Sequence, residues 1–234
     1  MCLYWLIFTH FHFIMQFLIH KNAGEQCLKL QGDSYHHLFR TRRTKKTQFL
    51  YLRNLRDLNC YTYSIASLDK KEALLHLISS KKTELINPPN GHLIWSIIEP
   101  KNIEKTLPIL NEFNLRKITF FYAEYSQKNF KLSKERLKKI LENSCEQCGR
   151  ITALEIEFLN NLEEILTKYP NLAILDFNGK SLKNLKEESI LIGPEGGFSP
   201  SERILFKNKS VYSALNCNIL RSENAAIYAT LGII

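Results

Sequence analysis

Residues 190–202, "ILIGPEGGFSPSE", join an apolar run to the start of a helix through a glycine-rich turn. The run Ser189–Ile192 is short and bounded by turn residues, which is typical of a buried strand. Ser199, Pro200 and Glu202 then have the spacing of a capping box, which predicts that a helix begins there. A buried strand that leads directly into a helix is the building unit of an α/β sheet.

The turn itself contains Gly193, Gly196 and Gly197, with Glu195 between them. Glycines allow positive φ and leave no Cβ, so they fit either a tight connection or a backbone that a ligand approaches closely. A carboxylate at the carboxyl end of a strand favours the ligand. The turn lacks Gly-Lys-Ser/Thr and the G-x-G-x-x-G spacing, which excludes a P-loop and a dinucleotide fold.

The composition indicates a globular protein with an acidic partner. The 234 residues are 44% hydrophobic, which is enough for a core, and the formal net charge is +9. Such a charge favours nucleic acid first and an anionic membrane surface second. The six cysteines lie far apart, as expected in a reducing cytoplasm. Cys145 and Cys148 form only half of a four-ligand set, so we expect no metal site.

The first fourteen residues, "MCLYWLIFTHFHFI", are unusually apolar. They have no basic n-region and no small-residue cleavage site, so they fit neither a signal peptide nor a spanning helix. We expect residues 1–14 to be a non-native extension, with translation starting at Met15, and no stable membrane association. A peripheral membrane anchor is the alternative.

The pattern of apolar runs predicts two domains. Residues 15–70 contain short strand-like runs such as "FLYL" and "CYTYSIA", which predict a small β domain, and 71–91 form a linker region around "INPPNG". Residues 92–234 alternate strands and helices, which predicts an α/β domain with a mainly parallel sheet. Expected strands are 93–98, 117–123, 154–159, 172–177, 189–193 and 211–215; expected helices are 102–114, 133–148, 160–169, 199–209 and 222 onward.

The first domain carries a basic run, "YHHLFRTRRTKK", at residues 35–46. A charge run is often only a solvated face. In a basic chain with aromatic and histidine neighbours, phosphate binding is the stronger interpretation. The residues expected to contact the phosphates of a nucleic acid are His37, Arg40, Arg42, Arg43, Lys45 and Lys46.

Three segments of the second domain should meet at one edge of its sheet: "LDFNG" at 175–179, "GPEGGF" at 193–198 and "ALNCNILRSENAA" at 214–226. In open α/β sheets, ligands bind at the carboxyl ends of the strands. "LIGPEGGFSPSE", "ILRSENAA" and "EQCGR" (146–150) together closely resemble the bacterial 16S ribosomal RNA uridine N3-methyltransferases of the SPOUT superfamily. "HHLFRTRR" is similar to the histidine-and-arginine segment of that family's PUA-like N-terminal domain.

The resemblance implies a C-terminal SPOUT-type α/β domain with a deep trefoil knot, preceded by a small PUA-like β-barrel domain. It implies S-adenosyl-L-methionine as cofactor, 16S ribosomal RNA of the small ribosomal subunit as substrate, a homodimer formed through the knot helices and a cytoplasmic location. By position, the residues expected to line the cofactor pocket are Leu175, Ile192, Gly193, Glu195, Gly196, Leu215, Asn216, Ile219 and Leu220.

The reaction that the resemblance implies is attack by uridine N3 on the methyl group of the cofactor, with removal of the N3 proton. Arg221 and Glu223, in the matched R-x-E, are the first candidates for polarising the uracil and accepting the proton. Glu146 and Arg150 are the second pair. Alternatively, Glu223 only complements a helix dipole, and Glu146 and Arg150 form a structural ion pair.

The chain departs from the family pattern at Tyr125, Asn216, Asn218 and Asn224. An alternative of another class is a non-catalytic RNA-binding protein that keeps the fold and the basic face. The intact glycine-rich turn and R-x-E favour the enzyme, since a protein freed from cofactor binding need not keep such a turn.

Overall fold

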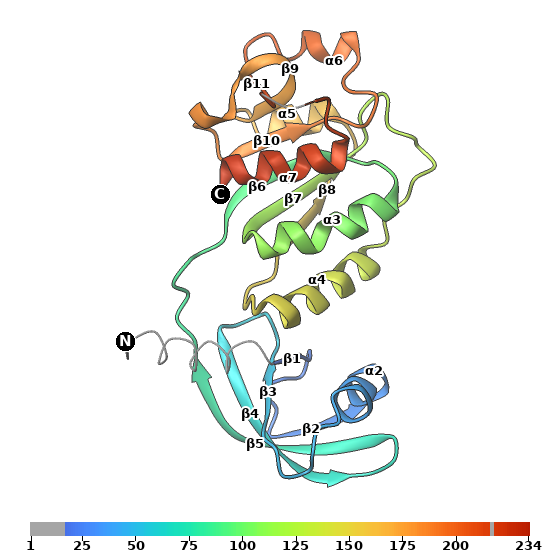
Figure 1. Ribbon diagram of the computed structural model, residues 1–234, viewed down its shortest axis with the longest axis vertical. Coiled ribbons are helices and arrows are strands. Elements are labelled where there is room, and N and C mark those ends of the chain that lie inside the picture. The colour runs from blue at the N-terminus through green and yellow to red at the C-terminus, as the bar shows by residue number, and fades with distance from the viewer. Residues whose placement is uncertain (1–16, 216–217) are drawn as a thin grey trace. The chain divides into compact units, whose positions relative to one another are not determined.

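The computed structural model describes residues 17–215 and 218–234. Residues 1–14, Met15 and Asn216 lie outside the described residues. The chain divides into two units (Figure 1). The first comprises the chain up to Asn87 together with Cys145–Ala153, and the second comprises Pro88–Ser144 and Leu154–Ile234.

The first unit is a curled five-stranded sheet in the order β1-β3-β4-β5-β2. Its strands are β1 (Leu18–Ile19), β2 (Cys27–Gln31), β3 (Leu50–Arg53), β4 (Asn59–Leu68) and β5 (Glu72–Lys82). Leu30, Leu52, Tyr63 and Leu75 are fully buried at its centre. Apart from the parallel pair β1 and β3, neighbouring strands are antiparallel. One buried face and one wet face are usual for such a sheet.

One element of this unit differs from the sequence-based expectation. β5 (Glu72–Lys82) occupies most of the stretch 71–91 that was expected to be a linker region. Its residues from Ser79 onward are exposed, so this half of the strand carries no apolar pattern to mark it. The turn α2 (Gly32–Tyr35) and the π-helix η1 (His36–Thr41) follow β2 and bury Tyr35 and Leu38.

The second unit is a six-stranded parallel sheet in the order β11-β9-β10-β6-β7-β8. The strands are β6 (Asn90–Ser96), β7 (Leu115–Phe121), β8 (Glu155–Phe158), β9 (Ala173–Ser181), β10 (Ser189–Ile192) and β11 (Ser210–Ser213). The helices are α3 (Pro100–Glu112), α4 (Lys134–Cys148), α5 (Leu162–Lys168), α6 (Pro200–Ile204) and α7 (Ser222–Ile233), with the short 3-10 helix η2 (Leu182–Asn184) after β9.

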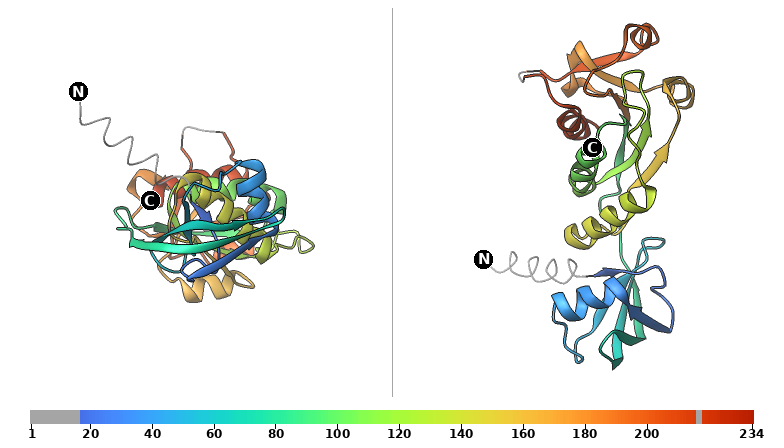
Figure 2. Two further views of the ribbon diagram at one scale, coloured as in Figure 1. Left: turned by 90° about the horizontal axis from the view of Figure 1, so that it is seen from below. Right: turned by 90° about the vertical axis from the view of Figure 1, so that its right-hand side faces the viewer.

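Both faces of this sheet are covered, because successive residues of a strand point to opposite faces. Leu93 and Trp95 of β6 pack in one cluster with α3, α4 and α7, whereas Ile94 packs in another with α5 and with Phe198 and Phe206, which flank α6. Figure 2 shows α3 and α7 on one side of the sheet and α5 on the other. Buried apolar residues on both faces explain why β6, β7, β9 and β10 appear in the sequence as continuous apolar runs.

The strands and helices predicted for residues 92–234 are all present, with ends shifted by a few residues. The helix expected at 199–209 is shorter than predicted, because α6 ends at Ile204. The chain continues in i→i+3 turns, with the amide of Phe206 bonded to Arg203 and that of Lys207 to Ile204. Ile204 and Leu205 stay exposed there, so a longer helix would bury no apolar stripe. Within residues 17–215 and 218–234, none of the helices has the length and apolar character that crossing a bilayer requires.

The predicted capping box at the start of α6 is confirmed. The Ser199 hydroxyl accepts from the Glu202 amide at 3.1 Å, and the Glu202 carboxylate accepts from the Ser199 amide at 2.9 Å. The other Glu202 oxygen accepts from the amide of Glu124, the third residue after the end of β7. This cap therefore fixes the exit of the glycine-rich loop to the segment that follows β7.

Candidate cofactor site

A cavity of about 630 Å³ opens at the carboxyl ends of β9 and β10. Its walls come from three segments far apart in the sequence: 175–179, 192–198 and the stretch from Ser213 to Ala225. Leu175 of β9 and Ile192, the last residue of β10, form the last pair of the ladder between these two strands. Parallel strands bring their carboxyl ends to one edge, so the topology alone gathers these segments.

The glycine-rich loop 193–197 forms one wall. Of its glycines, only Gly197 has a positive φ (69°), whereas positive φ was expected to be available at all three. Gly193 matters for space instead: a Cβ there would lie 3.3 Å from the Gly197 carbonyl carbon and from the Phe198 ring. A Cβ on Gly196 would make an ordinary 3.4 Å contact with Tyr125. The loop therefore needs glycine at two positions for two different reasons.

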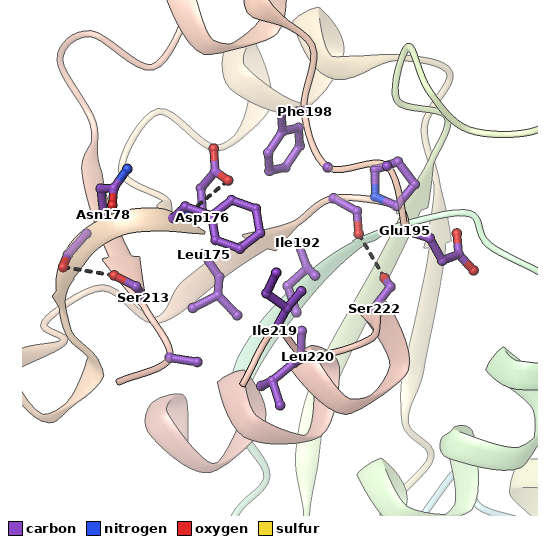
Figure 3. A pocket seen from close by; sticks show the side chains of 18 of the residues that line it. Leu175, Asp176, Asn178, Ile192, Glu195, Phe198, Ser213, Ile219, Leu220 and Ser222 are labelled. Atoms are coloured by element: carbon purple, nitrogen blue, oxygen red, sulfur yellow. Dashed lines mark hydrogen bonds between the residues drawn. The ribbon is translucent and has the colours of Figure 1, made fainter. Parts of the chain in front are cut away.

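The third wall is fixed by Ser222, the first residue of α7. Its hydroxyl donates to the Gly193 carbonyl at 2.8 Å and accepts from the Trp95 indole N–H at 2.9 Å. Figure 3 shows this bond, with Ile219 and Leu220 lying between α7 and Leu175.

Comparison with known proteins agrees with this geometry. A model of the RNA methyltransferase domain family matches residues 87–233. A Helicobacter pylori protein named ribosomal RNA small subunit methyltransferase E is 45% identical over 219 residues, covering 92% of this chain and 97% of its own length. The chain belongs to the ribosomal RNA small subunit methyltransferase E family.

Solved structures similar to this member of the family share its two-domain α/β fold. A putative methyltransferase from Legionella pneumophila, solved in complex with the bound cofactor SAM, is 25% identical with a TM-score of 0.77, covering 93% of this chain and 95% of its own. A ribosomal RNA small subunit methyltransferase E from Neisseria gonorrhoeae has a TM-score of 0.76 at 21% identity, covering 94% and 96%. The expected fold class, a small N-terminal β domain followed by a SPOUT-type α/β domain, is confirmed, with the β domain formed by a curled sheet.

Eight residues that the family resemblance assigned to the cofactor pocket line the cavity of this structure. They are Leu175, Ile192, Gly193, Glu195, Gly196, Leu215, Ile219 and Leu220. Asn216, the ninth, lies outside the described residues. Cofactor binding by these residues stays a prediction, but they do converge in space.

Arg221 and Glu223 flank Ser222 at the start of α7. Arg221 is exposed and caps the helix with an extended backbone. Oε2 of Glu223 is buried and has no hydrogen-bond partner among the described residues. Neither side chain belongs to the cavity lining, although Ser222 and Ala225 beside them do. A buried carboxylate oxygen without a hydrogen-bond donor costs free energy. Glu223 is therefore the candidate to which a bound ligand would supply the missing hydrogen bond.

Glu146 and Arg150 belong to the first unit and make contacts within it. Glu146 accepts a hydrogen bond from the Ile19 amide at 2.7 Å. Arg150 is 8% exposed and donates through Nε to the Thr152 carbonyl at 3.1 Å. Burial lowers the pKa of Arg150, and Cys145 and Cys148 oppose that shift. These bonds give both residues a structural task, and their catalytic role stays a prediction.

The basic run lies on η1 and the loop after it. Arg40, Arg42, Arg43, Lys45 and Lys46 are all exposed, and His37 is half-buried. Arg43 has a positive φ of 52°, which is uncommon for a side chain of this size. Arg40 donates to the Lys70 carbonyl at 3.1 Å. Because these side chains are exposed, RNA can reach them. Their binding of RNA stays a prediction.

Sequence analysis assigned no role to several residues of the cavity. Asp176, Phe177 and Asn178 lie within β9 after its buried first residues, Ser213 ends β11, and Ala214 follows it. Their position after buried residues was the available signal, since "LDFNG" was already placed at this edge. In the described parts of the chain, no three His, Cys, Asp or Glu side chains gather as a metal site would require.

Proposed function

We propose that this protein transfers a methyl group from S-adenosylmethionine to N3 of a uridine in the 16S ribosomal RNA of the small ribosomal subunit. The observation that carries the proposal is the cavity at the carboxyl ends of β9 and β10, walled by the family's glycine-rich loop and its C-terminal segment. The Helicobacter pylori relative and the SAM-bound Legionella pneumophila structure support it.

The residues present fit such a cofactor. A volume of about 630 Å³ is in the range of small-molecule sites. Leu175, Ile192 and Leu220 offer an apolar surface, and the loop 193–197 offers main-chain groups with little side chain in front of them. When bound, S-adenosylmethionine supplies an activated methyl group. The protein then has to hold the uracil in line and exclude water.

Proton removal falls to the start of α7. Uridine N3 carries a proton that must leave as the N–CH₃ bond forms. We assign its acceptance to Glu223, whose buried Oε2 lacks a donor among the described residues, and the polarisation of a uracil carbonyl to Arg221. Glu223 is fixed by α7, which Ser222 anchors to Gly193 and Trp95.

RNA is held by a second surface. We assign the phosphate contacts of the first unit to the exposed basic run, Arg40, Arg42, Arg43, Lys45 and Lys46 with His37. A homodimer through the C-terminal helix agrees with exposed apolar side chains on that segment, since Ile219, Leu231 and Ile234 are 82%, 55% and 47% exposed. The compartment we propose is the cytoplasm, where small ribosomal subunits are found.

The test is methyl transfer to small ribosomal subunits taken from a strain that lacks this modification. Subunits are incubated with the protein and labelled S-adenosylmethionine, and the RNA is digested to nucleosides for mass spectrometry. We expect labelled 3-methyluridine. A labelled nucleoside of another kind, or none, would refute the proposed reaction. RNA binding without transfer would favour the non-catalytic alternative.

A further inference from the structure

Strand β9 contains a bulge. Its pairing with β11 jumps from Ile174, opposite Val211, to Lys180, opposite Tyr212. The residues between, 175–179, leave that ladder and face the carboxyl edge of the sheet. The bulge depends on two backbone features: Asn178 has a φ of 60°, and a Cβ on Gly179 would lie 2.5 Å from the Tyr212 carbonyl carbon. Such bulges re-aim side chains next to functional sites.

The bulge separates two cavities. One is the proposed cofactor cavity, and the other also measures about 630 Å³. Asp176, Phe177 and Asn178 line both. The far wall of the second cavity is built by Arg203, Phe206, Lys207, Lys209 and Val211. A ligand that reaches the first cavity from this side has to pass the bulge.

Asp176 is fixed by Arg203, which donates to its two carboxylate oxygens at 2.7 and 3.1 Å. The Phe177 amide donates to Asp176 at 2.9 Å, and Ser213 donates to the Gly179 carbonyl at 2.8 Å. Figure 3 shows Asp176 and Asn178 on this wall. The bulge is therefore ordered from both ends, yet the Phe177 side chain between these bonds is 58% exposed. Because the ring is exposed, packing does not explain why an aromatic side chain occupies this ordered position.

The second cavity is basic. The Lys207 side chain is exposed and makes no hydrogen bond or ion pair with any residue that the structure describes, and Lys209 is half-buried and donates to the Pro170 carbonyl. Arg203 is matched by Asp176, so its charge is partly balanced. An exposed aromatic ring beside unmatched lysines is the usual arrangement for single-stranded nucleic acid, where bases stack and phosphates pair with cations.

We propose that this second cavity binds the single-stranded RNA that flanks the target uridine, with Phe177 stacking on a neighbouring base and Lys207 contacting a phosphate. The inference rests on the proposed function and adds a binding site to it. The occupant is RNA because the walls combine a free aromatic face with positive charge in a chain of net charge +9. The bulge then orients the strand so that the target base enters the cofactor cavity.

The test compares full-length wild type, Phe177→Ala, Phe177→Trp and Lys207→Glu. Three quantities are measured: the Kd for small ribosomal subunits that lack the modification, KM and kcat for methyl transfer to them, and the Kd for S-adenosylmethionine by calorimetry. Matched controls are Ile204→Ala, which removes an exposed apolar side chain from α6, and Lys183→Glu, which reverses an exposed lysine outside both cavities.

Phe177→Ala should raise the Kd and KM for subunits about tenfold, because loss of base stacking costs this much or more. Phe177→Trp should restore them. Lys207→Glu should weaken subunit binding and reduce its salt dependence by about one unit of slope. The Kd for S-adenosylmethionine should stay within about twofold in Lys207→Glu and should change less than the Kd for subunits in the Phe177 variants, because this ring borders both cavities. The two controls should match wild type.

Three results would overturn the inference. Unchanged subunit affinity in Phe177→Ala would leave no role for stacking. A loss confined to S-adenosylmethionine affinity would place the ring on the cofactor. If light scattering gave Phe177→Ala a different molar mass from wild type, a second copy of the chain would be what covers the ring in wild type. If wild type binds subunits but transfers no methyl group, the proposed function fails, and the Kd values still decide this inference. If wild type does not bind subunits, both fail.

Discussion

Two polar regions of the second unit's sheet differ in whether their polar atoms have hydrogen-bond partners. The proposed cofactor cavity at the carboxyl edge is open, and Oε2 of Glu223, next in the chain to the lining residue Ser222 but outside the lining itself, has no hydrogen-bond partner among the described residues. The polar cluster of β6, β7 and β8, on the face that α5 covers, comprises His92, Thr119, Glu157 and Tyr169 with Lys117 and Lys168. In that cluster both nitrogens of the histidine ring and both oxygens of the glutamate carboxylate have partners.

The bonds of the polar cluster fix its protonation. Thr119 donates to Glu157 at 2.9 Å, so it accepts from Nε2 of His92 at 2.8 Å, and Nδ1 accepts from Ser189 at 3.0 Å. Burial, with Lys117 and Arg116 nearby, lowers the pKa of His92 to about 3. The histidine is therefore neutral at physiological pH.

Glu157 is held in its charged form by the same bonds. Burial would raise the pKa of Glu157, but hydrogen bonds from Lys168, Tyr169 and Thr119 lower it to about 2. Strongly shifted pKa values are often taken as marks of an active site. Here they come from a saturated network that leaves no group for a ligand, so the difference between the regions teaches that function should be sought where a polar atom lacks its partner.

The largest effect should follow from Glu223→Gln. The amide keeps the shape of the side chain but cannot accept the N3 proton, so kcat for methyl transfer should fall about 100-fold. The Tm should not fall, because no hydrogen bond to this oxygen is lost. Single-turnover transfer and thermal unfolding measure the two quantities. Full activity would show that Glu223 only complements the helix dipole.

Gly193→Val should damage the cavity without unfolding the sheet. The branched side chain would collide with Gly197 and Phe198, so the loop must open, and the Kd for S-adenosylmethionine should rise about 30-fold. Gly232→Ala is the matched control, since its Cβ would make an ordinary 3.7 Å contact with Leu182. Equal cofactor affinity in the two variants would remove the loop from the binding site.

Glu157→Gln should lower stability and leave cofactor affinity unchanged. It removes a charge that accepts hydrogen bonds from Thr119, Lys168 and Tyr169, so the free energy of unfolding should fall by about 2 kcal/mol. Urea titration measures this loss. The Kd for S-adenosylmethionine should stay at the wild-type value, and a cofactor defect would contradict the separation of the two regions.

The pH dependence of the free energy of unfolding should show that the polar cluster contributes to stability. Because the folded pKa of His92 is below the ordinary value of 6.5, the unfolded chain binds the proton first as pH falls, and stability declines from about pH 6.5 toward pH 3. Between pH 7 and 5.5 this histidine should cost about 1 kcal/mol. Glu157 contributes little there, since its stabilisation is lost only below 4.5. In urea titrations, His92→Gln should flatten this slope, and an unchanged slope would assign it to another group.

Ser199→Ala should have the smallest effect. It removes the acceptor for the Glu202 amide and the donor to Glu124, at a cost of about 1 kcal/mol in unfolding free energy. Cofactor affinity should change little, because the bond between Ser222 and Gly193 still holds the loop. A tenfold loss of affinity would show that the cap sets the loop's shape as well as its exit.

Local patterns could be predicted from the sequence, and contacts between distant segments could not. The capping box at Ser199 depends on four consecutive residues, and β6 and β10 are continuous apolar runs, so all three were predictable. The bulge of β9 depends on its pairing with β11, and the partners of His92 come from β7 and β10. Neither arrangement has a signature in one stretch of sequence.

The same division holds in the first unit and in the site. Long-range pairing makes β5 a strand where composition favoured a linker. The cavity residues Leu175, Gly193 and Leu220 were identified through the family resemblance, whereas Phe177 required coordinates, because only its exposure distinguishes it from the buried residues before it.

The most direct test of the account is calorimetric titration of S-adenosylmethionine into three proteins: wild type, Gly193→Val and Glu157→Gln. If the open cavity holds the cofactor, wild type and Glu157→Gln should show saturable binding with the same Kd, and Gly193→Val should bind about 30-fold more weakly. No heat with wild type at high micromolar cofactor, or a loss in Glu157→Gln with Gly193→Val unaffected, would contradict the claim that the open cavity is the cofactor site.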